Sequence, residues 1–146
     1  MRINTEKVAV VQRIVFCAGH RLWNYSGPCS SPHGHNYSVD LYVSAPELDK
    51  HGMIMDCLEL KTLFGDWIEE HWDHGFLCHS EDTPLVEFLS SMPEAKCFCF
   101  SDNPTVEVMA LYLLNTVGPK LLDGSGATLV RVALREVEMC GVDVSL

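Results

Sequence analysis

The sequence predicts one α+β domain over residues 1–146, with helices on one face of an antiparallel β-sheet. Two observations predict this class: some stretches alternate apolar and polar residues as strands do, and others have the apolar spacing of amphipathic helices. Along the chain the order is strand, strand, helix, helix, strand. With 146 residues, of which 47% are hydrophobic, the chain is long enough to enclose one core.

Composition limits the partners and the compartment. The formal net charge of −10 at pH 7 argues against nucleic acid and anionic membrane surfaces as partners. No apolar run approaches the ~20 residues of a membrane span, and the opening residues Met1 to Lys7 lack the apolar segment of a signal peptide. The seven cysteines are scattered and odd in number, which is typical of free thiols. We therefore expect a cytoplasmic protein.

Two strands are predicted before the first helix. The stretch Lys7–Cys17 alternates weakly and predicts a strand, which small residues and His20 follow. The stretch Trp23–Pro32 contains Gly-Pro and Ser-Ser-Pro and predicts a loop. The second strand begins at His33, and one of its faces carries His33, His35, Tyr37, Val39, Leu41 and Val43. Because that face is apolar beyond the histidines, it should pack against a helix.

Two amphipathic helices are predicted after these strands. The first has its apolar stripe at Leu60, Leu63, Phe64, Trp67 and Ile68. Asp56 is its expected N-cap. The second follows Pro104 and has its stripe at Val106, Met109, Ala110, Leu113, Leu114 and Val117. Gly118 and Pro119 are expected to end it.

The remaining stretches predict two strands. The segment 81–100 between the helices has the least regular pattern, and its tail, 96–100, is a candidate short strand. The last predicted strand is Thr128–Glu138. Its expected inner face carries Val130, Val132, Leu134 and Glu136.

His20, His33 and His35 are candidate metal ligands. Side chains at i and i+2 of a strand share a face, so His33 and His35 converge, and His20 lies at the end of the preceding strand. Three imidazoles suit zinc and leave its fourth position open, as catalytic sites do. The alternative is three ordinary histidines, because His-x-His alone is a weak motif. Cys29 is either a fourth ligand that closes the site or a base or nucleophile favoured as thiolate by the cation.

Five further residues are candidates for chemistry or binding. Asp73 beside His74 can fix the imidazole tautomer for proton transfer, although a surface histidine at a helix end is the simpler interpretation. Glu136 lies in line with apolar residues, so it is either a partly buried carboxylate that a ligand's amino group and ring N–H would satisfy, or a solvated strand end. For Thr105 and Glu107, at the start of the second helix, capping is the simple interpretation.

Six motifs together resemble those of the 6-pyruvoyl-tetrahydropterin synthase family, which includes the 6-carboxy-tetrahydropterin synthases of bacterial queuosine biosynthesis. In chain order they are Phe16-Cys-Ala-Gly-His20-Arg-Leu, Cys29 with His33-Gly-His35-Asn-Tyr37, Gly52-Met-Ile-Met-Asp56 with Leu60-Lys61, Trp72-Asp73-His74, Pro104-Thr105-Val-Glu107 and Arg135-Glu136. The set extends from the first strand to Glu136 and is more specific than any one motif.

The resemblance implies a fold, an assembly and a cofactor. The fold is the tunnelling fold, a four-stranded antiparallel sheet with two helices on one face. The assembly is a homohexamer made of two trimers, with sites at the subunit interfaces. The enzyme implied is a lyase that binds Zn2+ through His20, His33 and His35 and acts on 7,8-dihydroneopterin triphosphate.

The same resemblance implies roles for the other candidates. Cys29 is the base, and Asp73 with His74 forms an assisting dyad. Glu136 anchors the pterin. Thr105 and Glu107 lie near it.

Two details resemble the queuosine branch of the family more than the pyruvoyl branch. The spacing from Cys29 to His33 is short, and Val108 rather than asparagine follows Glu107. That branch forms 6-carboxy-5,6,7,8-tetrahydropterin with loss of triphosphate and acetaldehyde. The alternatives are a 6-pyruvoyl-tetrahydropterin synthase, which only eliminates triphosphate, and a non-catalytic paralogue that binds pterin or metal. The chain departs from the family pattern at Cys57, at Val137 and in the long segment 81–100.

Overall fold

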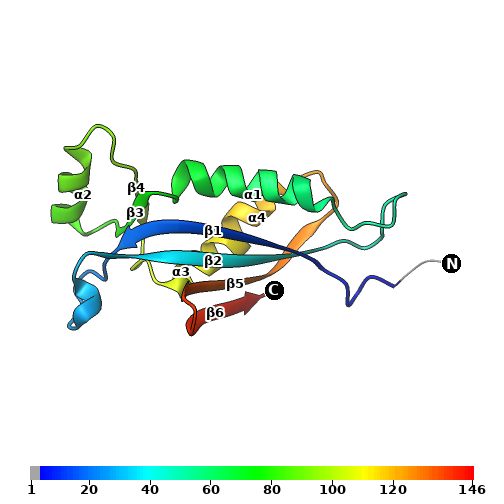
Figure 1. Cartoon of the computed structure of the whole chain (residues 1–146), viewed down its shortest axis with the longest axis horizontal. Coiled ribbons are helices and arrows are strands. Elements are labelled where there is room, and N and C mark those ends of the chain that lie inside the picture. Colours follow the sequence, from blue (N-terminus) through cyan, green and yellow to red (C-terminus); the bar gives the residue numbers. More distant parts are fainter. Residues whose placement is uncertain (1–3) are drawn as a thin grey trace.

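The computed structural model of the chain describes residues 4–146. Of the opening residues Met1 to Lys7, the first three lie outside the described residues. The fold is a six-stranded sheet in the order β4-β3-β1-β2-β5-β6, with helices packed against it (Figure 1). The strands are β1 (Val10–His20), β2 (His33–Ser44), β3 (Gly75–His79), β4 (Cys97–Phe100), β5 (Thr128–Val137) and β6 (Cys140–Ser145). The prediction of a four-stranded antiparallel sheet with two helices is therefore wrong, although the class α+β holds.

The described part of the chain contains three helical segments and one short helical turn. They are the turn η1 (Pro28–Ser30), the helices α1 (Cys57–His71) and α2 (Thr83–Ser90), and a continuous segment formed by α3 (Val106–Tyr112), the π-helical turn η2 (Leu113–Val117) and α4 (Gly118–Leu121). Asp56 caps α1 as expected, accepting a 2.8 Å hydrogen bond from the Leu58 N–H. Within residues 4–146, no helix combines the length and the apolar character needed to cross a membrane.

The sequence predicted that the third helical segment ends at Gly118-Pro119, and this prediction is wrong, because α4 continues through both residues. A proline ring clashes with the carbonyl four residues earlier in a regular α-helix and removes one N–H donor. Here the π-helical turn η2 ends at Val117, and α4 begins at Gly118. Pro119 thus occupies the first turn of α4, where a missing N–H costs little. The helix thus continues through the proline by a local change of hydrogen-bond pattern.

The main core lies between the sheet and two helical segments. Strands β1, β2 and β5 are antiparallel neighbours. The inner face of β2 carries the predicted apolar residues Tyr37, Val39, Leu41 and Val43, all with no solvent exposure. They share one cluster with α1, through side chains such as Phe64, and with the third segment, through side chains such as Met109. The expectation that this face packs under a helix is confirmed.

The segment after α1 is a β-α-β unit that the sequence analysis did not resolve. Strand β3 runs parallel to β1 and to β4, and α2 connects β3 to β4, because parallel neighbours need a crossover connection. Leu77 of β3 belongs to the main core, whereas its neighbour Cys78 packs with Leu85 and Leu89 of α2. Since successive strand residues point to opposite faces, α2 covers the face of β3 that is turned away from the main core.

Strand β5 carries two irregularities in register. The first lies opposite Tyr42 and Val43 of β2, which pair with Arg131 and Leu129, so Val130 is an extra residue without a partner in β2. As a result Leu129, and not Val130 as predicted, is the buried residue on the inner face. The second lies between Arg135 and Val137 in the pairing with β6. Glu136 is the unpaired residue there. β-Bulges of this kind redirect a side chain, and this one sets the direction of Glu136.

Candidate active site

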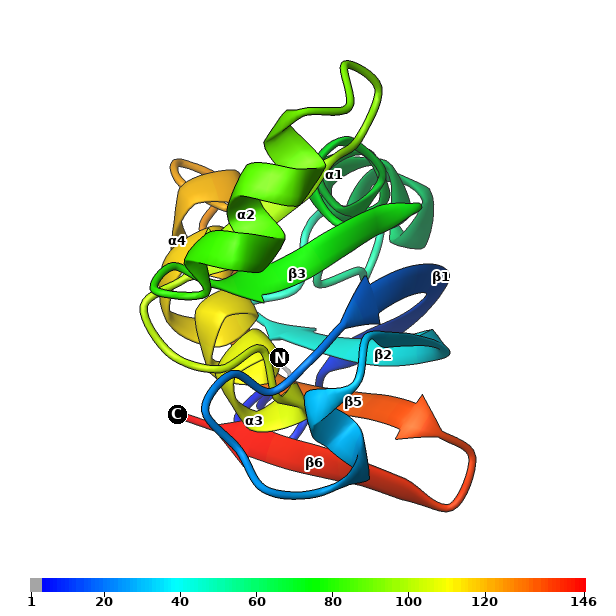
Figure 2. The same ribbon diagram turned by 90° about the vertical axis from the view of Figure 1, so that its left-hand side faces the viewer.

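The three predicted metal ligands meet at one end of the sheet, where β1 stops and β2 begins. Figure 2 shows the chain from this end. The antiparallel register pairs His20 with His33 and Ala18 with His35, so all three imidazoles lie on the inner face. One nitrogen from each ring lies within 4.8 Å of the other two, and the Nε2 atoms of His20 and His33 are 3.1 Å apart. His20 is buried and the other two rings are half-buried.

Hydrogen bonds to carbonyl groups fix the tautomers of two of these rings. The Nδ1–H of His20 donates to the Pro104 carbonyl at 2.7 Å, and the Nδ1–H of His33 donates to the Ser31 carbonyl at 2.6 Å. A carbonyl oxygen only accepts, so each Nε2 of a neutral ring carries a lone pair. These two lone pairs face each other at 3.1 Å and cannot bond to one another.

A cation held between the two nitrogens would resolve this arrangement. Zn–N distances of about 2.0–2.1 Å in a tetrahedral site separate two ligand nitrogens by roughly 3.3 Å, close to the distance in the structure. Carbonyls that accept the second ring N–H are the usual outer partners of metal-binding histidines. The donor set and its tautomers therefore fit zinc bound by three histidines.

We expect the stability of the metal-free protein to fall as pH drops below about 6.5. Burial lowers the pKa of His20 and His35 from the ordinary value of 6.5, so below that pH the unfolded chain binds more protons than the folded chain. Urea titrations of metal-free protein across this range measure the decline. Replacing His35 by asparagine should flatten it, whereas the same change at the exposed His51 should not. If unfolding free energy fell equally steeply with pH in wild type and in both variants, the lowered pKa of His35 would not be a cause of the decline.

Glu136 and Tyr37 complete the inner side of this centre. A carboxylate oxygen of Glu136 lies 3.7 Å from the Nε2 of His35, and the side chain of Glu136 is 29% exposed, so it is accessible to a ligand. The hydroxyl of Tyr37 is buried and has no hydrogen-bond partner among the described residues. Burial, together with the nearby Glu136 charge, raises the pKa of Tyr37, so its phenol stays protonated. An unpaired buried hydroxyl beside the histidines leaves a donor available at the site.

Thr105 and Cys29 lie on the segments that flank the histidines. Thr105 follows Pro104, whose carbonyl holds His20, and its hydroxyl accepts from the Val108 N–H at 3.2 Å as the N-cap of α3. Cys29 is exposed on η1, and its carbonyl accepts from the Leu22 N–H at 2.8 Å. The capping interpretation of Thr105 is confirmed.

Glu107 lies apart from these contacts. It occupies the first turn of α3 and is exposed. An acidic side chain in a first turn is favoured by the helix dipole.

Asp73 and His74 form a hydrogen-bonded pair after α1. One Asp73 oxygen accepts from His74 Nδ1 at 2.9 Å and the other accepts from the Cys17 N–H at 3.0 Å. Burial alone raises the pKa of Asp73, but the bonds from Cys17 and His74, with the charge of Lys96, outweigh it and lower the pKa. An ionised Asp73 keeps the proton of His74 on Nδ1 and leaves Nε2 to exchange protons. The His74 side chain is 80% exposed.

This pair lies on the opposite face of the sheet from the metal ligands. Along β1, Ala18 and His20 are buried on the inner face, so Cys17 points outward, and it is Cys17 that Asp73 and His74 contact. Cys17, His74 and Asn36 line an open cleft of about 400 Å³, and His35 of β2 also borders it. The ligand atoms of Asp73 and His74 cluster with that of Cys17 and not with those of the three histidines, so the dyad and the histidine centre are separate groups within one chain.

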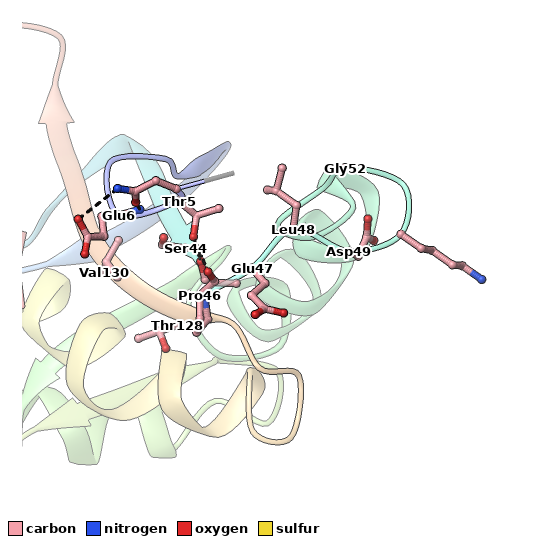
Figure 3. Close-up of a pocket in the computed structure, with 13 residues that line it drawn as sticks. Thr5, Glu6, Ser44, Pro46, Glu47, Leu48, Asp49, Gly52, Thr128 and Val130 are labelled. Carbon is pink, nitrogen blue, oxygen red and sulfur yellow. Dashed lines mark hydrogen bonds between the residues drawn. The ribbon is translucent and has the colours of Figure 1, made fainter. Parts of the chain in front are cut away.

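A larger cleft lies elsewhere in the described part of the chain. It has a volume of about 1050 Å³ and is formed where β2 ends at Ser44 and the loop beyond it begins, at the far end of the sheet from the histidines (Figure 3). The Thr5 hydroxyl, which lines this cleft, has the carbonyls of Ala45 and Pro46 at 2.7 and 2.8 Å and shares its one proton between them. No histidine or cysteine lines it, so it lacks the groups that the chemistry above requires.

The sequence profile of a family described as 6-pyruvoyl tetrahydropterin synthase matches residues 9–145 of the chain. A curated relative from Rickettsia bellii, named 6-carboxy-5,6,7,8-tetrahydropterin synthase, is 31% identical over 137 residues, which are 94% of this chain and 99% of the relative. The chain belongs to the 6-pyruvoyl tetrahydropterin synthase family. The resemblance found in the motifs is thereby confirmed.

Two further comparisons found similar proteins. A relative from Dictyostelium discoideum, named 6-pyruvoyl tetrahydrobiopterin synthase, is 29% identical over 126 residues, 80% of this chain and 82% of the relative. The crystal structure of an uncharacterized protein from Wolinella succinogenes matches with a TM-score of 0.78 at 21% identity, covering 94% of this chain and 97% of that one. This last similarity concerns the fold.

Several groups at the site were not found from the sequence. The Pro104 and Ser31 carbonyls that set the histidine tautomers are backbone atoms, which no residue pattern reveals. Tyr37 was interpreted as core, although its place two residues after His35 on the same face was a sign that it borders the centre. Cys17 was noted only within a motif, and its N–H is the group that holds Asp73.

Proposed function

We propose that this chain is a zinc-dependent lyase that converts 7,8-dihydroneopterin triphosphate to 6-carboxy-5,6,7,8-tetrahydropterin, with loss of triphosphate and acetaldehyde, in the cytoplasmic queuosine pathway. The observation that carries the proposal is the pair of facing Nε2 lone pairs on His20 and His33, in a member of a tetrahydropterin synthase family. The name of the Rickettsia bellii relative supports the carboxy product.

Each candidate residue has a role in this proposal. Zinc held by His20, His33 and His35 would supply Lewis acidity toward oxygens of the substrate side chain. The carboxylate of Glu136 accepts from the amino group and ring N–H of the pterin and so orients it.

Proton transfer is assigned to the remaining groups. Cys29, as thiolate, removes a proton from the side-chain carbon, and His74 returns one with Asp73 fixing its tautomer. Thr105 and Glu107 border the pterin.

The position of the dyad supports a homo-oligomer. Because Asp73 and His74 lie on the outer face, a second copy must bring its dyad to the histidine centre of the first, as a hexamer of two trimers would. The outer face of β1 exposes Val11 and Val15, with 46% and 66% of their surface open to solvent, which suits contact with another copy.

We expect inactive variants of different residues to complement each other. Cys29→Ala and His74→Ala are each expected to be inactive, but refolded together they should form sites with Cys29 from one copy and His74 from another, restoring roughly a quarter of wild-type activity. Activity of each variant alone, and of a co-refolded mixture whose mass is checked by light scattering, measures this. A mixed oligomer without activity would show that both residues come from the same chain.

We expect Cys29→Ala to retain zinc and fold while turnover falls by about 100-fold or more, because general base catalysis contributes about that much. Cys29 is exposed on η1, so little packing is lost. Zinc content, thermal unfolding and steady-state rates measure the three effects. Cys57→Ala, at another exposed cysteine, is the matched control. A thiolate charge-transfer band in the cobalt-substituted wild type that Cys29→Ala removes would instead make Cys29 a fourth ligand.

The proposed activity is tested directly with substrate. Zinc-loaded protein is incubated with 7,8-dihydroneopterin triphosphate, the pterin is identified by mass spectrometry and acetaldehyde is assayed. Carboxy-tetrahydropterin with acetaldehyde would support the proposal. Pyruvoyl-tetrahydropterin without acetaldehyde would establish the alternative named for the Dictyostelium relative. Pterin binding without turnover would indicate the non-catalytic paralogue.

A further inference from the structure

Asn103 joins two parts of the chain that the candidate site needs. Its side-chain oxygen accepts from the Trp23 N–H at 2.7 Å, and its side-chain N–H donates to the Trp23 carbonyl at 3.1 Å. The amide thus pairs with both backbone groups of one residue, as a neighbouring strand would. Trp23 lies three positions after His20, at the start of the loop 21–32 that carries Cys29.

The residue after Asn103 holds the metal ligand. The Pro104 carbonyl accepts the Nδ1–H of His20 at 2.7 Å, which is the bond that leaves Nε2 free. The backbone between the two is stiff: proline fixes its own φ and restricts the residue before it, and the Asn103 carbonyl also accepts from the Thr105 N–H at 2.8 Å. The direction of the Pro104 carbonyl is therefore tied to the anchoring of the Asn103 side chain.

The loop is held from the same point. Leu22, directly before Trp23, donates its N–H to the Cys29 carbonyl at 2.8 Å. Directly after Trp23 the chain turns at Asn24, whose φ is 55°. Fixing the Trp23 backbone thus fixes the neighbour to which Cys29 is hydrogen-bonded.

We propose that Asn103 is a positioning residue that sets the orientation of His20 for zinc and the place of Cys29 beside it. Its amide links the segment 103–104, which orients the ligand, to the loop 21–32, which carries the proposed base. The part that concerns zinc depends on the histidine geometry alone. The part that concerns Cys29 rests on the proposed function.

The test compares Asn103→Ala with wild type and with Asn115→Ala, a matched asparagine that is exposed on η2. Zinc dissociation constants are measured by competition with a chromogenic chelator, without substrate. Removing partners that orient a metal ligand weakens affinity by about 10- to 100-fold, so we expect that loss in Asn103→Ala and none in Asn115→Ala. With substrate, kcat should fall in Asn103→Ala while KM stays near the wild-type value.

The outcomes separate this inference from the proposed function. Wild-type zinc affinity in folded Asn103→Ala would overturn the inference, and so would a lower melting temperature with unchanged affinity, since that is a purely structural role. If Asn103→Ala does not fold, Asn103→Ser takes its place, because serine suits a turn but cannot reach both Trp23 groups. Wild type that binds zinc and forms no product would refute the proposed activity and leave the zinc comparison valid.

Discussion

Replacing His33 by alanine is expected to remove zinc and turnover together. His33 supplies one of three imidazoles whose nitrogens lie within 4.8 Å of one another, and its Nε2 faces that of His20 at 3.1 Å. Loss of a direct ligand should weaken zinc binding by more than the roughly 10- to 100-fold typical of outer partners. His33 is only half-buried at the start of β2, so the fold should persist without it.

Metal analysis after dialysis and the product assay measure the two losses in the same sample. The matched control is His51→Ala, at an exposed histidine in the loop before α1, which should keep zinc and activity. Cys29→Ala separates the effects, since it should lose turnover alone. Equal zinc content in His33→Ala and wild type would remove His33 from the ligand set.

The convergence of the histidines was predictable because it follows from strand geometry. His33 and His35 share a face by alternation, and His20 reaches them because an antiparallel hairpin pairs the end of one strand with the start of the next. Strand β1 is Val10–His20 rather than the predicted Lys7–Cys17. The sequence analysis ended the strand at the small residues 17–19, although strand pairing continues through them to His20.

The missing strands were hidden for different reasons. Strand β3 has five residues, too few for alternation to stand out. The short strand expected in 96–100 is confirmed as β4, but its parallel pairing with β3 depends on α2, which lies between them in sequence. Strand β6 is an edge with only two packed apolar residues, Val142 and Val144, so its alternation is weak. Segment 81–100 appeared irregular because it contains a helix and a strand joined by turns.

The position of the dyad shows what a motif leaves open. Asp73 and His74 were recognised as a pair from adjacency, and the hydrogen bond between them is present. Which face of the sheet they would reach depends on whether an odd or an even residue of β1 contacts them, a fact of tertiary packing. Since their ligand atoms cluster with the side-chain sulfur of Cys17, which points away from the face of the buried Ala18 and His20, the dyad faces outward.

Replacing Arg21 by alanine is expected to cost about 3–5 kcal/mol of unfolding free energy, because it leaves a buried carboxylate without its partner. Asp82 has no solvent exposure, and both its oxygens bond to the Arg21 guanidinium, one of them to Nε at 2.6 Å. Asp82 is the N-cap of α2 but makes no side-chain cap bond, so Arg21 is its main partner. The pair joins the residue after His20 to α2.

Replacing Asp82 by alanine should lower the unfolding free energy by less than replacing Arg21. In Asp82→Ala the guanidinium that loses its partner belongs to a side chain 25% exposed, so it can still reach water. Arg131→Ala is the matched control, since Arg131 also forms a two-bond pair with an aspartate, Asp143. Both of these side chains are about half exposed, and ion pairs open to solvent contribute little to stability. Urea titrations give the three values. The loss of unfolding free energy is expected to be largest for Arg21→Ala, smaller for Asp82→Ala and smallest for Arg131→Ala. If Arg21→Ala loses as little as Arg131→Ala, the Asp82 carboxylate is hydrated when Arg21 is absent, and the prediction is wrong.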